Sequence, residues 1–323
     1  FNSAVKSNLT LYAKWEANKY TVTFVANGGS DTAAQVVVHG GKAVRPADPA
    51  QDGFAFAGWC SDEGLGQAYD FDSVVKSDLT LYAKWERQGD PYAILYEDGF
   101  LSLQRGDDED ASHGGVVGSW AWDGSSIPWY DKRSRVRSVV ARDRVAVSNG
   151  HELFRGLESC RSMDLSRLDV SGASGLSRMF WNCSSLTSLD VSGWDVSNAS
   201  DLSSMFYGCS SLTSLDVSGW DVSGASDLSC IFEYCSSLTS LDVSGWDVSG
   251  ASGLSSMFWN CLSLTSLDVS GWDVSGTSGL SGMFTGCSSL TSLDVSGWDV
   301  SGASDLSDMF WGCSSLTSLD LSG

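Results

Sequence analysis

From about Leu153 onward, hydrophobic and polar positions repeat along the chain with a period of 26 residues. One copy begins at Leu186 and reads L-T-S-L-D-V-S-G-W-D-V-S-N-A-S-D-L-S-S-M-F-Y-G-C-S-S, and the next begins at Leu212. A tryptophan recurs with the same step at Trp194, Trp220, Trp246, Trp272 and Trp298, and a cysteine recurs at Cys183, Cys209, Cys235, Cys261, Cys287 and Cys313. A fixed period of this length predicts a solenoid, in which each unit buries its hydrophobic face against its neighbours.

The hydrophobic spacing changes halfway through each copy. In the first half, Leu186, Leu189 and Val191 fall on near-alternate positions, which predicts a short strand with Thr187, Ser188, Asp190 and Ser192 on its open face. In the second half, the spacing of three, one and three between Leu202, Met205, Phe206 and Cys209 is typical of one side of a helical turn. Each coil is therefore predicted to be a strand, a bend and a short helical return, stacked in parallel at about 4.8 Å per coil.

A longer repeat precedes the solenoid. Residues 1–16 reappear with few changes at residues 71–86, so 1–16 is predicted to be the tail of one unit and 17–87 a complete unit. Alternation predicts strands at Tyr20–Val25, Val36–Val38 and Leu79–Trp85, and Asn27-Gly28-Gly29 predicts a tight turn.

Residues 88–150 lack either repeat and lie where the first coil of a solenoid needs a cap. Tyr92 to Gln104 predicts a hairpin around Asp98-Gly99. Val136 to Val140 predicts a strand flanked by arginines, and a second interpretation is that these cations neutralise the acidic first coils or recruit an anionic partner. The predicted domains are thus 1–16, 17–87, a cap at 88–150, and a solenoid at 151–323 that is truncated at its C-terminus.

Charge narrows the choice of partners. The chain of 323 residues has a net charge of −21, and no Lys, Arg or His follows Arg178. Phosphate contacts require cations, so nucleic acid is excluded as a partner of the solenoid. No run of 18 apolar residues is present, so no transmembrane segment is expected in this fragment.

The nine cysteines do not have the spacing of a disulfide framework. Six of them occupy one repeated position flanked by Phe and Leu, which favours small buried free thiols over disulfides between adjacent coils. Cys60, Cys160 and Cys230 fall outside this column, and the sequence does not fix their disulfide state.

Two stretches resemble known families. Y-T-V-T-F-V-A-N-G-G, the Gly58-Trp59 pair and L-T-L-Y-A-K-W resemble the Listeria–Bacteroides repeat of bacterial surface proteins, which implies a small, β-rich, β-grasp-like module that acts as a spacer. The repeated L-x-x-L-x-V-x-x-W frame and D-V-S-G-W-D-V-S-x-A-S-D-L-S-S-M-F-x-G-C, preceded by P-W-Y, resemble the BspA-type leucine-rich-repeat surface proteins. The second resemblance implies a leucine-rich-repeat solenoid, an extracellular location on a bacterial cell, and adhesion. This chain has D-V-S-G-A where members of the family often have D-T-S-N-V. The resemblance does not specify a ligand.

Catalysis is not expected, because His39, His113 and His151 lie in different segments and no phosphate loop, zinc spacing or hydrolase elbow is present. We therefore predict that the protein is not an enzyme.

Aspartates form two columns, and the first is a candidate acidic binding face at Asp190, Asp216, Asp242, Asp268 and Asp294. Like charges about 5 Å apart repel by about 0.8 kcal/mol per pair in water, or about 4 kcal/mol over the five neighbour pairs of this column when Asp320 is included. Salt, hydrogen bonds from Ser or Thr, raised pKa values or bound cations such as Ca²⁺ would relieve this repulsion. The favoured interpretation is a solvated face with Ser and Thr hydrogen bonds and no cofactor, and bound Ca²⁺ is the alternative.

Aromatic residues occupy two further columns. Trp194 and its equivalents are predicted to form a buried spine, with a carbohydrate-stacking stripe as the alternative. The other position also accepts Glu233 and Thr285, which predicts an exposed edge and a candidate contact strip at Trp181, Tyr207, Trp259 and Trp311. Ordinary surface packing is the alternative for this strip.

These patterns together predict a non-catalytic surface adhesin that recognises a host extracellular or bacterial surface protein or glycan through repeated sites. The alternative is a passive structural stalk, stabilised by Ca²⁺ in one version. The last coil ends at Gly323 without a cap, which predicts that the natural chain continues and that the bare edge supports self-association.

Overall fold

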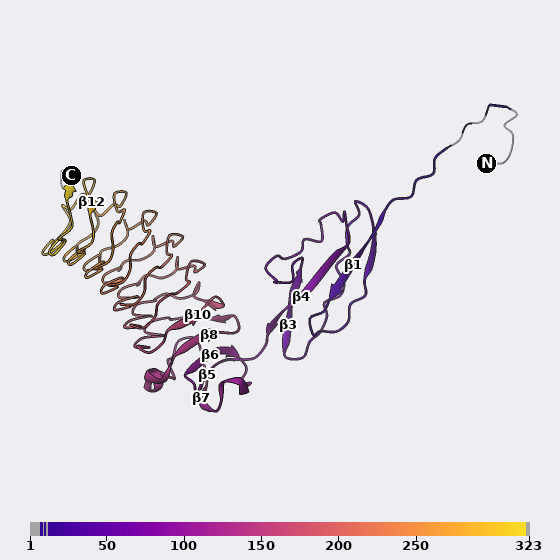
Figure 1. Ribbon diagram of the computed structural model, residues 1–323, viewed down its shortest axis with the longest axis horizontal. Coiled ribbons are helices and arrows are strands. Elements are labelled where there is room, and N and C mark those ends of the chain that lie inside the picture. The colour runs from indigo at the N-terminus through magenta and orange to yellow at the C-terminus, as the bar shows by residue number, and fades with distance from the viewer. Residues whose placement is uncertain (1–6, 9, 11, 321–323) are drawn as a thin grey trace. The chain divides into compact units, whose positions relative to one another are not determined.

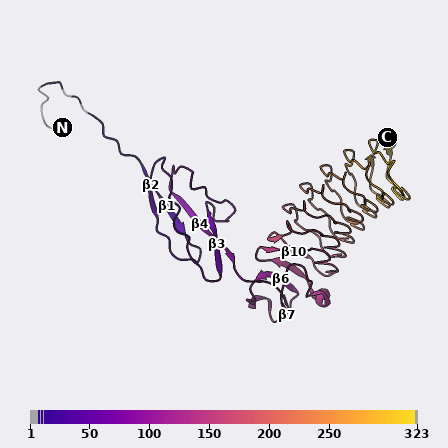
Figure 2. The ribbon, with the colours of Figure 1, turned by 180° about the vertical axis from the view of Figure 1, so that it is seen from behind.

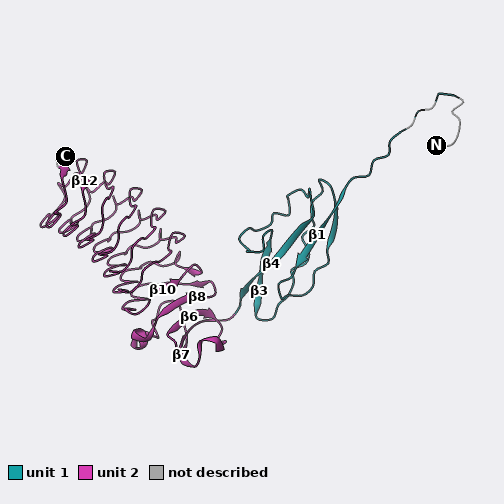
Figure 3. Cartoon of the chain, in the orientation of Figure 1, with its two compact units in different colours: residues 1–88 teal, residues 89–323 magenta. Residues whose placement is uncertain are grey.

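The computed structural model describes residues 7–8, 10 and 12–320, apart from the side chain of Asp320. Much of the predicted repeat tail at 1–16 therefore lies outside the described residues. The protein is β-rich with almost no helix, and its residues fall into two compact units, Phe1–Gln88 and Gly89–Gly323 (Figure 3).

The first unit contains a four-stranded sheet. Its strands are β1 (Lys19–Val25), β2 (Gln35–Val38), β3 (Phe54–Cys60) and β4 (Leu79–Arg87), in the order β2-β1-β4-β3. The central pair β1 and β4 is parallel, and the outer pairs are antiparallel. Val22, Trp59 and Leu81 are buried in its core. The three predicted strands and the turn at Asn27-Gly28 are confirmed, and β3 is an additional strand that the sequence analysis missed.

The second unit begins with a five-stranded sheet in the order β10-β8-β6-β5-β7. These strands are β5 (Pro91–Tyr96), β6 (Phe100–Arg105), β7 (Val116–Ala121), β8 (Ser138–Ala141) and β10 (Ser162–Asp164). A small second sheet pairs β9 (Val145–Ala146) with β11 (Leu168–Asp169), and two short 3₁₀ helices, η1 (Ala111–His113) and η2 (Tyr130–Arg135), lie nearby. The β5–β6 pair confirms the predicted hairpin, and β8 corresponds to the strand predicted beside the arginines.

This sheet continues into the repeats. Strand β10 belongs to the first coil and pairs with β8, so the two regions share one sheet. They also share one hydrophobic core, in which Trp129 stacks on Phe154 and Phe154 on Phe180, with ring centroids 6.5 and 5.6 Å apart. Residues 89–150 thus cover the first coil with hydrophobic side chains.

The repeats form a stack of 26-residue coils that follow one another along the second unit (Figures 1 and 2). We call residues Leu186–Ser197 and their equivalents the face half of each coil, and Ala199–Ser210 and their equivalents the turn half. In the turn half, Leu202, Ser204, Phe206 and Gly208 donate backbone hydrogen bonds of 2.8–3.0 Å to the next coil. Parallel bridges connect successive coils from Gly175 through Asp201 and Asp227 to Asp305.

The predicted helical turn is wrong. No helix is present in the described part of the repeats, where the turn half consists of consecutive hydrogen-bonded turns. Alternate N–H groups bind the next coil, so they are not available for bonds within a helix. Each turn half also contains two left-handed residues four positions apart, such as Ser204 (φ 56°) and Gly208 (φ 71°), and these interrupt any helix. The second left-handed residue directly precedes the column cysteine, and Tyr234 (φ 60°) adopts this conformation although it is not glycine or asparagine.

The predicted strands of the face half are mostly reduced to extended segments. Among the described residues of the regular coils, β12 (Ser292–Asp294) pairs with β13 (Ser318–Asp320), and a single bridge joins Ser214 to Ser240. Threonine N–H groups reach the previous coil at 3.1–3.5 Å, which is longer than the bonds of the turn half. The stacked tryptophan rings of this half are 6.4 Å apart, against 5.4–5.8 Å for stacked phenylalanines of successive coils in the turn half. The wider spacing prevents a continuous ladder.

The tryptophan column is buried, as predicted, with 3–9% of each residue exposed. Trp220, Trp246, Trp272 and Trp298 each donate a 3.0 Å hydrogen bond from Nε1 to the carbonyl of a valine 29 residues earlier. All nine cysteines are free thiols, and the column cysteines are buried except Cys313, which is partly exposed. Their Sγ atoms donate to phenylalanine carbonyls of the previous coil, as Cys235 does to Phe206 at 3.2 Å. Burial raises the pKa of Cys209 to about 12.

Candidate functional site

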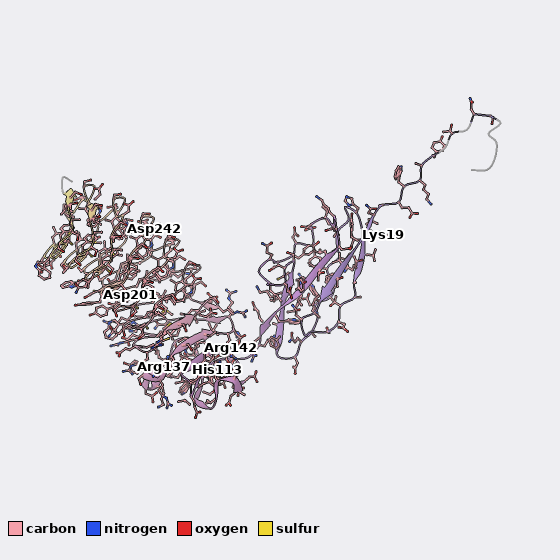
Figure 4. All side chains as sticks on the ribbon, viewed as in Figure 1. Lys19, His113, Arg137, Arg142, Asp201 and Asp242 are labelled. Atoms are coloured by element: carbon pink, nitrogen blue, oxygen red, sulfur yellow. The ribbon has the colours of Figure 1, made fainter. Side chains whose placement is uncertain are left out.

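The most regular exposed surface of the protein is a serine–aspartate face on the face half of the coils. It is made by the sequence S-L-D-V-S, in which the leucine and valine point into the core and the flanking serines and aspartate point outward. All five candidate residues of the acidic face are exposed, at Asp190, Asp216, Asp242, Asp268 and Asp294. Asp242 is labelled in Figure 4, together with Asp201 of the turn half.

Each of these carboxylates is held by the serine two residues later. Ser192 donates to Asp190 Oδ1 from its backbone N–H at 3.1 Å and from its hydroxyl at 2.8 Å, and the other four coils repeat both bonds. Oδ2 of each carboxylate takes no hydrogen bond from the described residues. In the second column, the serine two residues later donates its backbone N–H to Asp195 and to each equivalent, and its hydroxyl also donates at Asp195, Asp221 and Asp247.

These hydrogen bonds favour the charged form of the carboxylates. Those from Ser192 lower the pKa of Asp190, and the equivalent serines lower the pKa of Asp242 and Asp294. In the second column, bonds from Ser197 lower the pKa of Asp195, and the opposing effect of neighbouring aspartates is smaller. Salt, hydrogen bonds, raised pKa values and bound cations were the expected ways to relieve repulsion between aspartates of one column. Hydrogen bonds from serine are present, and the pKa values of Asp190, Asp195, Asp242 and Asp294 are lowered and not raised.

A groove of about 920 Å³ runs along this face from Met163 to Ser266. Leu189, Leu215 and Leu241 contribute to it, and the carboxylates of Asp190, Asp216 and Asp242 line it at successive coils. Asp268 and Asp294 lie beyond the groove on the same face. The groove presents the same chemistry repeatedly, with a hydrophobic floor and hydroxyl and carboxylate walls.

The basic stretch of the cap lies near the start of the face. Arg144 binds Oδ2 of Asp169 at 2.7 Å, and this contact agrees with the interpretation that cap arginines neutralise the first coils. Arg142, which is labelled in Figure 4, pairs instead with Asp110 of the same region, and its guanidinium lies 5.4 Å from the ring of Phe100.

The candidate aromatic strip is more buried than its sequence position suggested. Trp181, Tyr207 and Trp259 are half-buried, and Trp311 is 70% exposed. Trp181 is enclosed on its two faces, by Arg155 at 4.7 Å and by Tyr207 at 5.5 Å. The ring of Trp259 lies over Gly282 of the next coil.

The argument that this position is exposed because it accepts Glu and Thr is wrong. Thr285 is buried, and Glu233 is half-buried with its pKa raised by desolvation. Tyr234, which the sequence analysis did not single out as a site residue, packs edge-on against Tyr207 and is 39% exposed. Trp181, Tyr207 and Tyr234 line a shallow hollow of about 610 Å³.

Each of the three histidines has a different partner. His113 binds Asp98 at 2.8 Å, His151 binds Ser177 at 2.7 Å, and His39 lies 3.3 Å from the hydroxyl of Tyr20 in the first unit. Within residues 7–8, 10 and 12–320, no group of three or more His, Cys, Asp or Glu side chains is placed to hold a metal ion. No helix in the described part of the chain has the length and hydrophobicity needed to cross a membrane.

Two family models match the chain. The Listeria-Bacteroides repeat domain matches residues 20–84. The model described as "Mycoplasma protein of unknown function, DUF285" matches residues 148–266 and 226–322, which together cover more than half of the chain.

Curated relatives match shorter segments. Two proteins of Evansella cellulosilytica, named "Putative Gly-rich membrane protein" and "Putative membrane protein", are 44% identical over 96 residues and 47% identical over 94 residues. Internalin H of Listeria monocytogenes is 33% identical over 86 residues. These matches cover 29%, 29% and 26% of this chain but only 11%, 14% and 15% of the respective relatives.

Proposed function

The chain belongs to the family described as Mycoplasma protein of unknown function, DUF285, and on that premise we propose that it is a non-catalytic adhesin of the bacterial cell surface. The proposal assigns recognition of a host extracellular or bacterial surface partner to the serine–aspartate face. It places the protein outside the cell, and it gives the Listeria-Bacteroides repeat unit the role of a spacer. The names of the relatives, two membrane proteins and an internalin, support a location at the surface.

The proposal includes a fold assignment. We propose that the stack is a leucine-rich-repeat solenoid of the BspA type, capped by residues 89–150. Its 26-residue period, buried leucine and tryptophan columns and parallel bridges between coils support this assignment. The absence of helix from the described turn halves makes it a solenoid built of strands, extended segments and turns.

The observation that carries the proposed function is the repetition of one exposed binding chemistry along a groove. Successive coils present an aspartate with one carboxylate oxygen bound by serine, beside a hydrophobic floor. A partner that binds one coil weakly gains avidity by binding several, since the second contact is intramolecular. The net charge of the repeats favours a partner surface rich in Lys or Arg.

An attachment assay tests the proposal. Beads coated with the full chain are applied to epithelial cells, matrix proteins and bacterial cells. Replacement of Asp190, Asp216 and Asp242 by Asn keeps the acceptor for serine and removes three charges, and we expect retention to fall at least tenfold. The matched control removes three exposed charges from the first unit, in Asp31→Asn, Asp52→Asn and Glu63→Gln. Equal retention of both variants would contradict the assignment of this face.

A passive stalk is the second candidate. The observation that favours it is that a serine of the same coil already binds one oxygen of each aspartate, so a partner is not needed to hold these carboxylates in place. A stalk predicts no specific retention of the wild-type chain on any tested surface. A Ca²⁺-stabilised stalk further predicts that CaCl₂ raises the melting temperature more than NaCl of equal ionic strength does.

A further inference from the structure

We propose that the shallow hollow beside Tyr234 receives an arginine side chain that projects from a partner protein. The hollow lies on the turn half of the first coils and has a volume of about 610 Å³, within the range of sites that hold small groups. Asn182, Gly208 and Tyr234 occupy the same position of three successive coils, and all three line it.

Tyr234 has a backbone conformation that its side chain does not favour. Its φ of 60° is in the left-handed region, where the equivalent residues of the other regular coils are glycine or asparagine. A bulky residue in this region is strained, and such strain is concentrated at functional sites. The residue is also 39% exposed, so burial in the core does not account for the tyrosine. The ring is available to a ligand.

Three aromatic side chains line the hollow. The rings of Tyr234 and Tyr207 meet at an angle of 65°, with their centroids 5.4 Å apart. Tyr207 also stacks on Trp181, and both of these residues are half-buried, so Tyr234 offers the largest accessible ring surface. Tryptophan and tyrosine are the residues that most often dominate the binding energy of protein interfaces.

Glu158 gives the hollow its charge. It is exposed, and among the described residues that line the hollow it is the one that is charged. Arg155, three residues earlier, pairs with Glu152. A carboxylate beside aromatic rings favours a cation, which gains both an ion pair and a cation–π interaction.

Arginine fits this combination better than other cations. Its guanidinium is planar, so it can pack on a ring while its N–H groups reach a carboxylate, whereas a lysine ammonium has no flat face. The protein already contains such a pair, because the guanidinium of Arg155 lies 4.7 Å from the ring centroid of Trp181. Glu158 would repel an acidic group, and a neutral group would leave its charge without a partner.

This inference goes beyond the proposed adhesin function, because it assigns a second site on the other half of the coils. Binding at the hollow is measured on the isolated protein. It can therefore fail while the attachment assay on the serine–aspartate face succeeds, and the reverse also holds.

Indole NMR of the full chain tests the proposal. The ¹⁵N-labelled protein is titrated at 150 mM NaCl with N-acetylarginine amide, its neutral isostere N-acetylcitrulline amide, N-acetyllysine amide and N-acetylglucosamine. The Trp181 signal is identified by its loss in Trp181→Phe. We expect the arginine derivative to shift this signal with a Kd of about 5 mM, and the other three probes to bind at least fivefold more weakly.

Variants of the hollow check the location. Tyr234→Gly removes the ring and places the residue that suits φ 60°, so it should weaken binding at least tenfold without lowering the melting temperature. Glu158→Gln should also weaken binding at least tenfold. The matched control is Asn260→Gly, the same exchange of a left-handed residue outside the hollow, and it should leave the Kd within twofold of wild type.

The replacement of Asp190, Asp216 and Asp242 by Asn separates the two sites. It should leave the Kd at the hollow within twofold of wild type, and a tenfold loss would show that the arginine derivative binds the serine–aspartate face instead. An unchanged Kd in Tyr234→Gly would overturn the site. Equal binding of the citrulline derivative, tighter binding of any other probe, or no shift with the arginine derivative would overturn the arginine assignment.

Discussion

The two halves of each coil are joined to the neighbouring coils in different ways. The turn half joins coils through backbone hydrogen bonds of 2.7–3.3 Å at nearly every alternate residue and through a column of stacked phenylalanines. The face half joins them through longer threonine contacts and through side chains, namely the tryptophan N–H groups. The tight half therefore determines the stack, and the looser half carries the exposed chemistry without being needed to close the backbone.

Removal of a phenylalanine from the tight half is expected to have the largest effect. Phe232 is fully buried between the rings of Phe206 and Phe258. Phe232→Ala should lower the free energy of unfolding by about 3–5 kcal/mol, because it leaves a cavity in a column with no alternative packing. Guanidinium denaturation of the full chain measures this. The control, Thr239→Ala on the face half, should change the free energy by less than about 0.5 kcal/mol, and similar losses in both variants would remove the distinction between the halves.

Glycine-to-alanine substitutions should also distinguish the two halves, with a smaller loss of stability. Gly286 of the turn half has φ 73°, and an added Cβ would lie 2.2 Å from Oδ1 of Asn260 in the previous coil. Gly286→Ala should therefore cost about 1–3 kcal/mol. Gly271 of the face half is the matched control, since an added Cβ there meets nothing within 4 Å. Gly271→Ala is expected to leave the melting temperature unchanged. A loss of stability as large as that of Gly286→Ala would contradict the distinction between the two halves.

The buried columns could be predicted from the sequence and the conformation of the turn half could not, for physical reasons. The column of Trp194 and the buried cysteines follow from strict periodicity, because a residue that must meet its own copy one coil later faces the same neighbours each time. The helix at Leu202–Cys209 was wrong because a spacing of three, one and three also fits consecutive turns, and nothing within one coil shows that its N–H groups bind the next.

The site was predictable in part. The exposure of Asp190 and its bond with Ser192 follow from the local D-V-S sequence, since both residues belong to one turn of chain. The half-buried state of Glu233 did not follow, because it depends on residues of neighbouring coils.

Thiol reactivity tests whether the turn half stays closed in solution. Burial raises the pKa of Cys160 to about 11 and that of Cys287 to about 12, so the thiolate is scarce near neutral pH. At pH 8, the reaction with Ellman's reagent should be at least tenfold slower in the native protein than in guanidinium. Six or more thiols that react in the native protein at the rate of the unfolded chain would show that the tight half opens readily.

Acid is expected to have the smallest effect on stability, and to act through the aspartates of the face half. Serine hydrogen bonds lower the pKa of Asp190, Asp242 and Asp294 in the folded protein, so the folded state favours the carboxylates. This stabilisation is complete above the unfolded pKa of about 3.9 and is lost as the pH falls through the lower folded pKa. The melting temperature should therefore fall below about pH 4, and it should fall less steeply when these three residues are Asn. Parallel pH curves for the variant and the wild type would show that these bonds do not contribute.

The strict repetition of contacts between adjacent coils has a consequence for inheritance. Recombination that removes Leu212–Ser237 joins Ser211 to Leu238 within an unchanged S-S-L-T-S sequence, and the remaining leucines, tryptophans, phenylalanines and cysteines of the core columns meet neighbours of the same kind. A gene for such a chain can lengthen or shorten its product by whole coils in one event, without a compensating mutation elsewhere. The length of the stack can thus vary within a population while the fold stays the same.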